Sequence, residues 1–167
     1  EIYTLSDTLL LDALPILFMV AVTAKMVSEL RDATGVSMME CKKALVEAEG
    51  DRDRAIQLLR ERGMASAQKR AGRATNQGIV AAAVAGDGRT ASLVEVNCET
   101  DFVARNDQFK AFVETLAQDA LKTDAPLADT MKDAVTSMIQ KTGENMQIRR
   151  NLRLCAQGEG RIAFPGT

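Results

Sequence analysis

The stretch that decides the fold is residues 79–98, which read IVAAAVAGDGRTASLVEVNC. Its first half is a β-compatible apolar run that ends at Gly86-Asp87-Gly88, a typical turn signal. Its second half, from Thr90, alternates between apolar and mostly polar positions, as a strand with one face toward a core does. The positions expected to face that core are Val94, Val96 and Cys98. The stretch therefore predicts an antiparallel β-hairpin.

Two helices and a third strand are predicted downstream of the hairpin. The first helix starts near Phe109 and keeps apolar residues three and four positions apart until Pro126 breaks it. The second ends at Gly143. Residues Ile148 to Leu154 then alternate, which is the period of a strand lying beside the hairpin. The expected fold class is α+β, an antiparallel three-stranded sheet covered by two helices over residues 78–157.

Upstream of the hairpin, residues 19–63 predict a module of three short helices. The second of them starts with a capping box, in which Ser37 accepts a hydrogen bond from a free backbone N–H while Glu40 reaches back. Along the whole module, the helical spacing of the apolar residues and the glycines that end each helix indicate the same helix boundaries. The predicted helices run between Thr23 and Gly35, between Ser37 and Gly50, and between Asp51 and Gly63.

The remaining segments are expected to be a linker and two ends. Residues 64–77 are rich in Ala, Lys and Arg and predict a basic linker, whose first residues are compatible with a helix that runs out at Gly72 and Gly78. A solvated connector is favoured over a nucleic-acid contact for its basic residues. Residues 1–18 follow neither a helical nor a strand period, so we expect a non-native leader there. The apolar stretch near the start is interrupted by Asp12 and Pro15, is shorter than the ~20 residues of a membrane span, and lacks the preceding basic residues of a secretory signal. Residues 158–167 predict an irregular, truncated tail.

The composition argues against most catalytic chemistry. The chain has 167 residues and no histidine, which excludes a Ser-His-Asp triad, a Cys-His dyad and a histidine-ligated metal. Its three cysteines, Cys41, Cys98 and Cys155, lie far apart and form no metal-binding pair, as is usual for free thiols in a reducing cytoplasm. A net charge of −2 and a pI near 5.3 provide no basic field for nucleic acid. We therefore expect neither an enzyme nor a metal or cofactor site.

Three motifs resemble those of the bacterial-type elongation factor Ts family, in the same order and spacing. The first lies within residues 28–45, the second is Glu95–Ala104 (EVNCETDFVA), and the third is Gly143–Arg150 (GENMQIRR). The resemblance covers about Met19 to Gln157. It implies that the three-helix module is like a ubiquitin-associated domain, that the native chain begins near Met19, and that the sequence is truncated after the first core subdomain.

The resemblance implies a guanine-nucleotide exchange factor for elongation factor Tu, acting in translation elongation in the cytoplasm. Such a protein would bind its partner in the GDP-bound and nucleotide-free states and promote GDP release by disturbing the Mg²⁺ and phosphate site. The exchange factor needs only a greater affinity for the partner's state in which the contacts to the phosphates are broken, so no covalent chemistry is required. The missing second subdomain puts dimerisation in doubt, and no direct contact with nucleic acid or membrane is implied.

The resemblance also assigns two groups of partner-binding residues. One lies in a turn between the hairpin and the next helix, where the aromatic ring of Phe102 would act as a wedge in an apolar pocket of the partner. The residues alone favour Phe102 as a core residue instead. The members of this exchange loop are Thr100, Asp101, Phe102 and Val103.

The second group lies in the three-helix module and consists of Arg31, Met38 and Met39. Adjacent residues in a helix point about 100° apart, so both methionines cannot face one narrow core stripe. One of them is therefore expected to be exposed, where a flexible thioether suits a partner's groove. The alternative is that both pack inside.

Three alternatives to the exchange function remain open. An adaptor could use the three-helix module alone, although it would have no need of the loop at Phe102. Nucleic-acid binding would rest on Lys69, Arg70, Arg73 and the arginines of residues 149–153, against the acidic pI. An enzyme would have to use isolated carboxylates or thiols, and Cys98 has no histidine to activate it.

Overall fold

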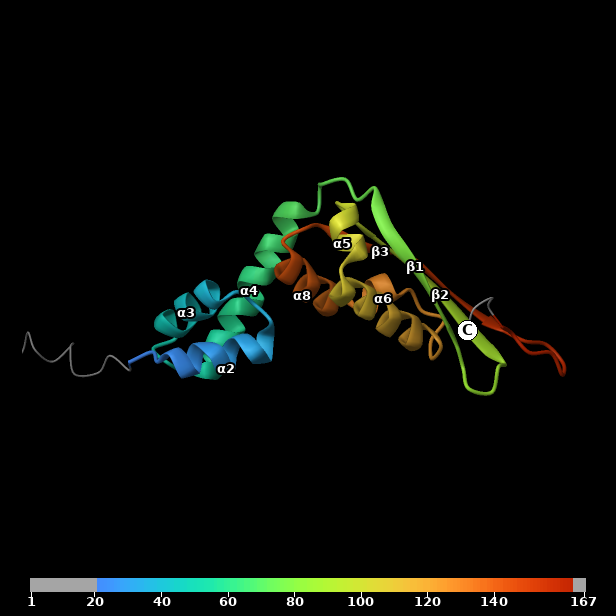
Figure 1. Ribbon diagram of the computed structural model, residues 1–167, viewed down its shortest axis with the longest axis horizontal. Helices are drawn as coiled ribbons and strands as arrows, with labels where there is room; N and C mark the ends of the chain where they lie inside the picture. Colours follow the sequence, from blue (N-terminus) through green and yellow to red (C-terminus); the bar gives the residue numbers. More distant parts are fainter. Residues whose placement is uncertain (1–20, 164–167) are drawn as a thin grey trace, which may run out of the picture. The chain divides into compact units, whose positions relative to one another are not determined.

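The computed structural model describes residues 21–163, which belong to two compact units that divide between Arg62 and Gly63. Figure 1 shows helices in the first unit and a sheet with helices in the second. The predicted leader, residues 1–18, and residues 164–167 of the predicted tail lie outside the described residues.

The first unit is made of α2 (Ala24–Thr34), α3 (Met38–Glu47) and the first part of α4 (Arg52–Arg70). The predicted starts of all three helices are confirmed, because a side-chain oxygen caps each one, which is worth about 1 kcal/mol per helix. The caps are Thr23 on the amide of Met26, Ser37 on that of Glu40, and Asp51 on those of Asp53 and Arg54. The core of the unit consists of Val27, Leu30, Val36, Cys41, Ala44, Leu45, Ala48, Ala55 and Leu59.

The predicted end of the third helix at Gly63 is wrong, since α4 continues to Arg70 and takes in the first residues of the predicted linker. A glycine inside a helix costs only about 1 kcal/mol, and the alanine-rich residues that follow restore helical propensity. Ala67 also packs against the core of the second unit. A Cβ at Gly63 would lie 2.7 Å from Gln140 Oε1, so the glycine leaves room for the end of that side chain.

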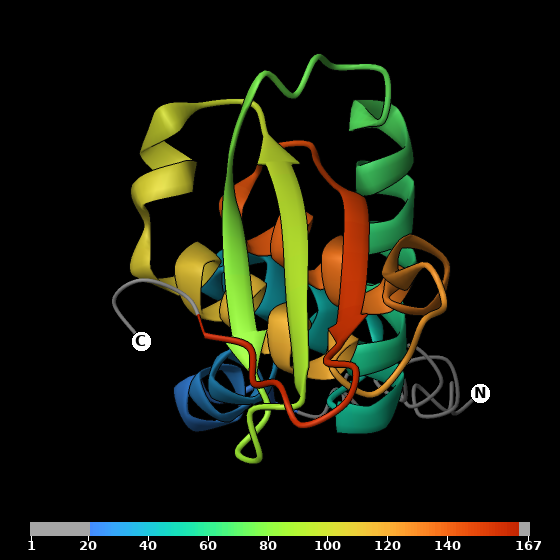
Figure 2. The same ribbon diagram turned by 90° about the vertical axis from the view of Figure 1, so that its right-hand side faces the viewer.

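The second unit contains the predicted three-stranded antiparallel sheet, in the order β1-β2-β3. Its strands are β1 (Gln77–Val84), β2 (Thr90–Cys98) and β3 (Met146–Cys155). The two predicted helices, α6 (Asp107–Ala120) and α8 (Lys132–Thr142), cover one face of it, as Figure 2 shows. The predicted α+β architecture is therefore confirmed.

The core of the second unit lies between the sheet and these helices. Phe109, Val113 and Leu116 of α6 are almost completely buried against the strands. The predicted inward positions of β2 are confirmed, because Val94, Val96 and Cys98 are fully buried. Two short helices, α5 (Asp101–Arg105) and α7 (Leu127–Thr130), were not expected.

The alternation predicted for the third strand is interrupted by a β-bulge. Val96 pairs with Ile148 and Glu95 with Arg150, so Arg149 is the extra residue. Ile148 therefore faces the core, whereas Leu152 lies on the open face of the sheet with 51% of its surface exposed. The core-side positions beyond the bulge are polar. They are taken by Asn151, which accepts from Leu127 N at 2.9 Å, and Arg153, which donates to Leu121 O at 2.8 Å.

Candidate functional site

The segment expected to be a turn after the hairpin forms the short helix α5. Thr100 is its N-cap, and the Thr100 hydroxyl accepts a hydrogen bond from Val103 N at 3.4 Å. Asp101, in the first turn, pairs with Arg105 in the last turn at 3.2 Å, and both charges suit the helix dipole. Ala104 is buried and anchors the helix to the core.

Phe102 is the most exposed large apolar side chain in the described part of the protein, with 83% of its surface open to solvent. The alternative that Phe102 belongs to the core of its own unit is therefore wrong. Val103, the next residue, packs against that core instead. Of the four residues predicted for the exchange loop, Phe102 is thus presented outward while Thr100 and Val103 hold the helix in place.

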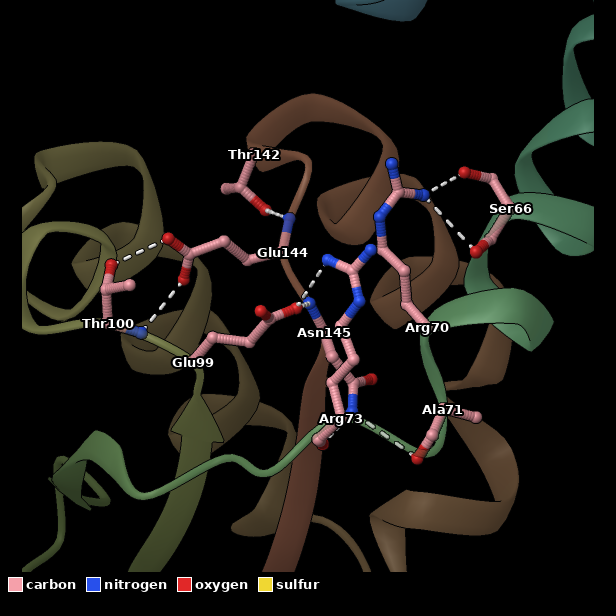
Figure 3. A network of polar contacts seen from close by, with 9 residues as sticks. All are labelled: Ser66, Arg70, Ala71, Arg73, Glu99, Thr100, Thr142, Glu144 and Asn145. Atoms are coloured by element: carbon pink, nitrogen blue, oxygen red, sulfur yellow. Dashed lines mark hydrogen bonds and ion pairs between the residues drawn. The ribbon is translucent and has the colours of Figure 1, made fainter.

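A carboxylate from elsewhere in the chain holds the start of α5. Glu144 Oε1 accepts a hydrogen bond from Thr100 Oγ1 at 2.6 Å, and its Oε2 accepts one from Thr100 N at 3.0 Å. Figure 3 shows that Glu144 reaches Thr100 from the turn that precedes β3. Sequence reasoning gave Glu144 no role, although it lies inside the third motif.

Two further side chains next to Glu144 join three segments of the second unit (Figure 3). Glu99 Oε1 accepts a hydrogen bond from Asn145 N at 2.5 Å and pairs with Arg73 at 3.4 Å. Asn145 is buried, and its amide nitrogen donates to the carbonyl oxygens of Arg73 at 2.8 Å and of Ala71 at 3.5 Å. The turn before β3, the end of β2 and the segment after α4 are thereby tied together.

Cys98, the last residue of β2, contacts Thr100 through its side chain. Its side chain is completely buried, and its Sγ donates to Thr100 O at 3.2 Å. Burial raises the pKa of the Cys98 thiol above its ordinary value of 9.0, and the negative charge of Glu144 raises it further. The sulfur is therefore a neutral donor at physiological pH, not a nucleophile.

The predicted group in the three-helix module lies in the other unit. Met38 and Met39 are 44% and 65% exposed, so both methionines are open to solvent where one was expected. Both belong to the first turn of α3, before the buried stripe that starts at Cys41. Val46 is also exposed and lies seven positions after Met39, on the same face of the helix. Arg31 is exposed in the last turn of α2.

Neither metal chemistry nor a membrane span is indicated for residues 21–163. No group of three or more Cys, Asp or Glu side chains in that range is placed to hold a metal ion. None of the helices described there is long and apolar enough to cross a bilayer.

Comparison with known proteins agrees with the motifs. Residues 99–163 match the family model of Elongation factor TS. Elongation factor Ts of Arthrospira platensis is 54% identical over 150 residues, which are 83% of this chain and 61% of that protein. The proteins of the same name from Clostridium tetani and Hydrogenovibrio crunogenus are 47% and 50% identical, over 81% and 78% of this chain and 49% and 48% of their own lengths. The chain thus spans about half to three-fifths of these relatives, and over the part it shares with them it belongs to the elongation factor Ts family.

Proposed function

We propose that this chain binds elongation factor Tu and promotes the release of GDP from it. The observation that carries the proposal is the exposure of Phe102 on a helix that the rest of the unit holds in place. This helix lies within the region that matches the family model. An aromatic side chain held in solvent makes little contribution to its own fold, and aromatic residues are typical anchors of protein interfaces.

Exchange requires no covalent chemistry. A GTPase holds its nucleotide through phosphate contacts and Mg²⁺, and a protein that binds the state in which these contacts are broken lowers the affinity for GDP. Linkage is reciprocal, so nucleotide binding then expels the exchange factor. In this scheme Phe102 enters an apolar pocket of the nucleotide-binding domain and Asp101 accompanies it. The partner is bound in both its GDP-bound and its nucleotide-free states, in the cytoplasm.

The three-helix module supplies a second contact in this proposal. Met39 and Val46 form an exposed apolar face of α3, and Met38 adjoins it at the start of the helix. Methionine adapts its shape to a partner's groove because its side chain is unbranched and polarisable. Arg31 adds a positive charge at the exposed end of α2.

The test is the release of a fluorescent GDP analogue from purified elongation factor Tu. The full chain is compared with its Phe102→Ala variant and with Val80→Ala, a matched control in which another exposed apolar residue, 63% open on β1, is shortened. We expect the full chain and the control to accelerate release and Phe102→Ala to lose most of the acceleration. A folded chain that binds elongation factor Tu without accelerating release would overturn the proposal in favour of an adaptor that uses the three-helix module alone.

A further inference from the structure

Helix α5 cannot be stable by itself. It has five residues, whereas isolated helices below about 12 residues are marginal in water. Its most prominent side chain, Phe102, is exposed and contributes little packing to hold it. The position of Phe102 therefore depends on the contacts made by the residues on either side of it.

The first of these contacts is the double hydrogen bond between Glu144 and Thr100. It satisfies the backbone amide of the N-cap residue and orients the hydroxyl that in turn caps Val103 N. Hydrogen bonds to a carboxylate are roughly twice as strong as neutral ones. The side chain of Glu144 is partly shielded from solvent, which strengthens the contact further.

Glu144 is itself held on both sides. Its backbone amide donates to Thr142 Oγ1 at 3.4 Å, at the end of α8. The following residue, Asn145, is buried and bonded to Glu99 and to the carbonyl oxygen of Arg73. Cys98 pairs with Met146 in the sheet, so Thr100 and Glu144 extend from adjacent ends of two paired strands. The carboxylate thus has a fixed base from which to reach α5.

We propose that Glu144 is a positioning residue for nucleotide exchange, which holds the start of α5 so that Phe102 is already placed for docking. The inference rests on the proposed role of Phe102. Its physical basis is that ordering a side chain on binding costs conformational entropy. A side chain that is already ordered in the free protein avoids this cost, so more of the contact energy contributes to affinity.

The activity test is a double-mutant cycle in the GDP-release assay, with variants Glu144→Ala, Phe102→Ala and both together. We expect Glu144→Ala to lower kcat/KM for release by at least about tenfold, because both charge-assisted hydrogen bonds to Thr100 are lost and even one of them is worth about that factor. The same substitution in the Phe102→Ala background is expected to cost nothing more, because the function of Glu144 is exerted through Phe102. A general loss of folding would lower activity equally in both backgrounds. Additive losses would therefore overturn the inference.

Substitutions at both partners of the Thr100–Glu144 contact, together with a control, test whether this contact is the cause of the effect. Thr100→Val removes the hydroxyl, which is one of the two donors to Glu144 and also caps Val103 N, so it should lower activity as Glu144→Ala does. Glu144→Gln keeps one accepting oxygen and should lie between the full chain and Glu144→Ala. Glu114→Ala, which removes an exposed carboxylate on α6, should change nothing.

Hydrogen exchange provides a readout that needs no partner. In the full chain carrying Glu144→Ala, amides of residues 100–105 should exchange faster, while those of β2 keep their protection. Unchanged protection of α5 would overturn the positioning role whatever the activity. If the unmodified chain does not accelerate GDP release, the proposed function fails instead. If Phe102→Ala is inactive and Glu144→Ala is fully active, the positioning role alone fails.

Discussion

The carboxylate of Glu144 accepts hydrogen bonds from both the hydroxyl and the backbone amide of Thr100, although the two residues lie 44 positions apart. One oxygen of the carboxylate serves each donor, at 2.6 Å and 3.0 Å. This pair connects the turn before β3 to the N-cap residue of the helix that carries Phe102. The helix that carries the exposed aromatic ring is therefore held to the second unit by this polar contact as well as by the packing of Val103 and Ala104.

Replacing Phe102 by alanine should leave the stability of the chain unchanged. Its side chain is 83% exposed, and substitutions at such positions usually change the free energy of unfolding by no more than about 0.5 kcal/mol. Phe109→Ala, at a fully buried position on α6, should cost about 3–5 kcal/mol. Urea denaturation followed by circular dichroism measures both. A large loss for Phe102→Ala would mean that the ring packs against its own unit.

Gly78 should not tolerate a side chain. A Cβ there would lie 2.2 Å from the carbonyl oxygen of Val96 and 2.8 Å from the Cα of Asn97, both of which are backbone atoms that cannot move aside. We expect Gly78→Ala to separate β1 from β2 locally and to cost about 1–3 kcal/mol. Gly86→Ala serves as the control, because nothing lies within 4 Å of its Cβ position. Equal melting temperatures for the two variants would contradict this prediction.

The stability of the chain should fall at alkaline pH through Cys98. Burial, then the charge of Glu144, raises the pKa of this thiol in the folded state above 9.0. Between the ordinary pKa of 9.0 and the raised folded value, the folded protein binds more protons than the unfolded chain. The contribution of Cys98 to stability is therefore complete below the ordinary pKa and is lost as the pH rises through the folded value. Denaturation midpoints measured from pH 7 to pH 10.5 should decline less steeply for Cys98→Ala.

The three thiols should differ in their rate of chemical modification because they differ in burial. Cys155 is exposed at the end of β3, whereas Cys41 and Cys98 are buried. A disulfide reagent should therefore label one cysteine per chain quickly and the other two only as the chain opens. Rapid labelling that persists in Cys155→Ser would contradict the burial of Cys98 and Cys41.

Met39→Ala should weaken binding to elongation factor Tu without destabilising the three-helix module. Met39 is 65% exposed, so its truncation removes little packing within the chain. If it lies at the interface, the loss of a contact worth about 1–2 kcal/mol raises Kd by about 5- to 30-fold. Calorimetric titration measures the change, and Met64→Ala, also at an exposed methionine, is the control. Unchanged affinity would remove Met39 from the proposed contact.

Local patterns in the sequence were reliable where the physical cause is local. The hairpin follows from a period of two around a glycine turn, and the starts of α2, α3 and α4 follow from side chains that cap amides two or three residues away. The same reasoning failed at Gly63. There the helical propensity of the following residues and the contact of Ala67 with the core outweigh the cost of one glycine.

The sequence by itself determined the α+β class, the strand order of the hairpin, the starts of α2, α3 and α4, and the residues that resemble those of the elongation factor Ts family. Only the tertiary structure decided that Phe102 points into solvent, that Leu152 turns away from the core after the bulge, and that Glu144 holds Thr100. The reason is that periodicity and capping act between residues a few positions apart. The direction of a side chain on a five-residue helix depends instead on contacts from strands and turns more than forty positions away, which no local pattern encodes.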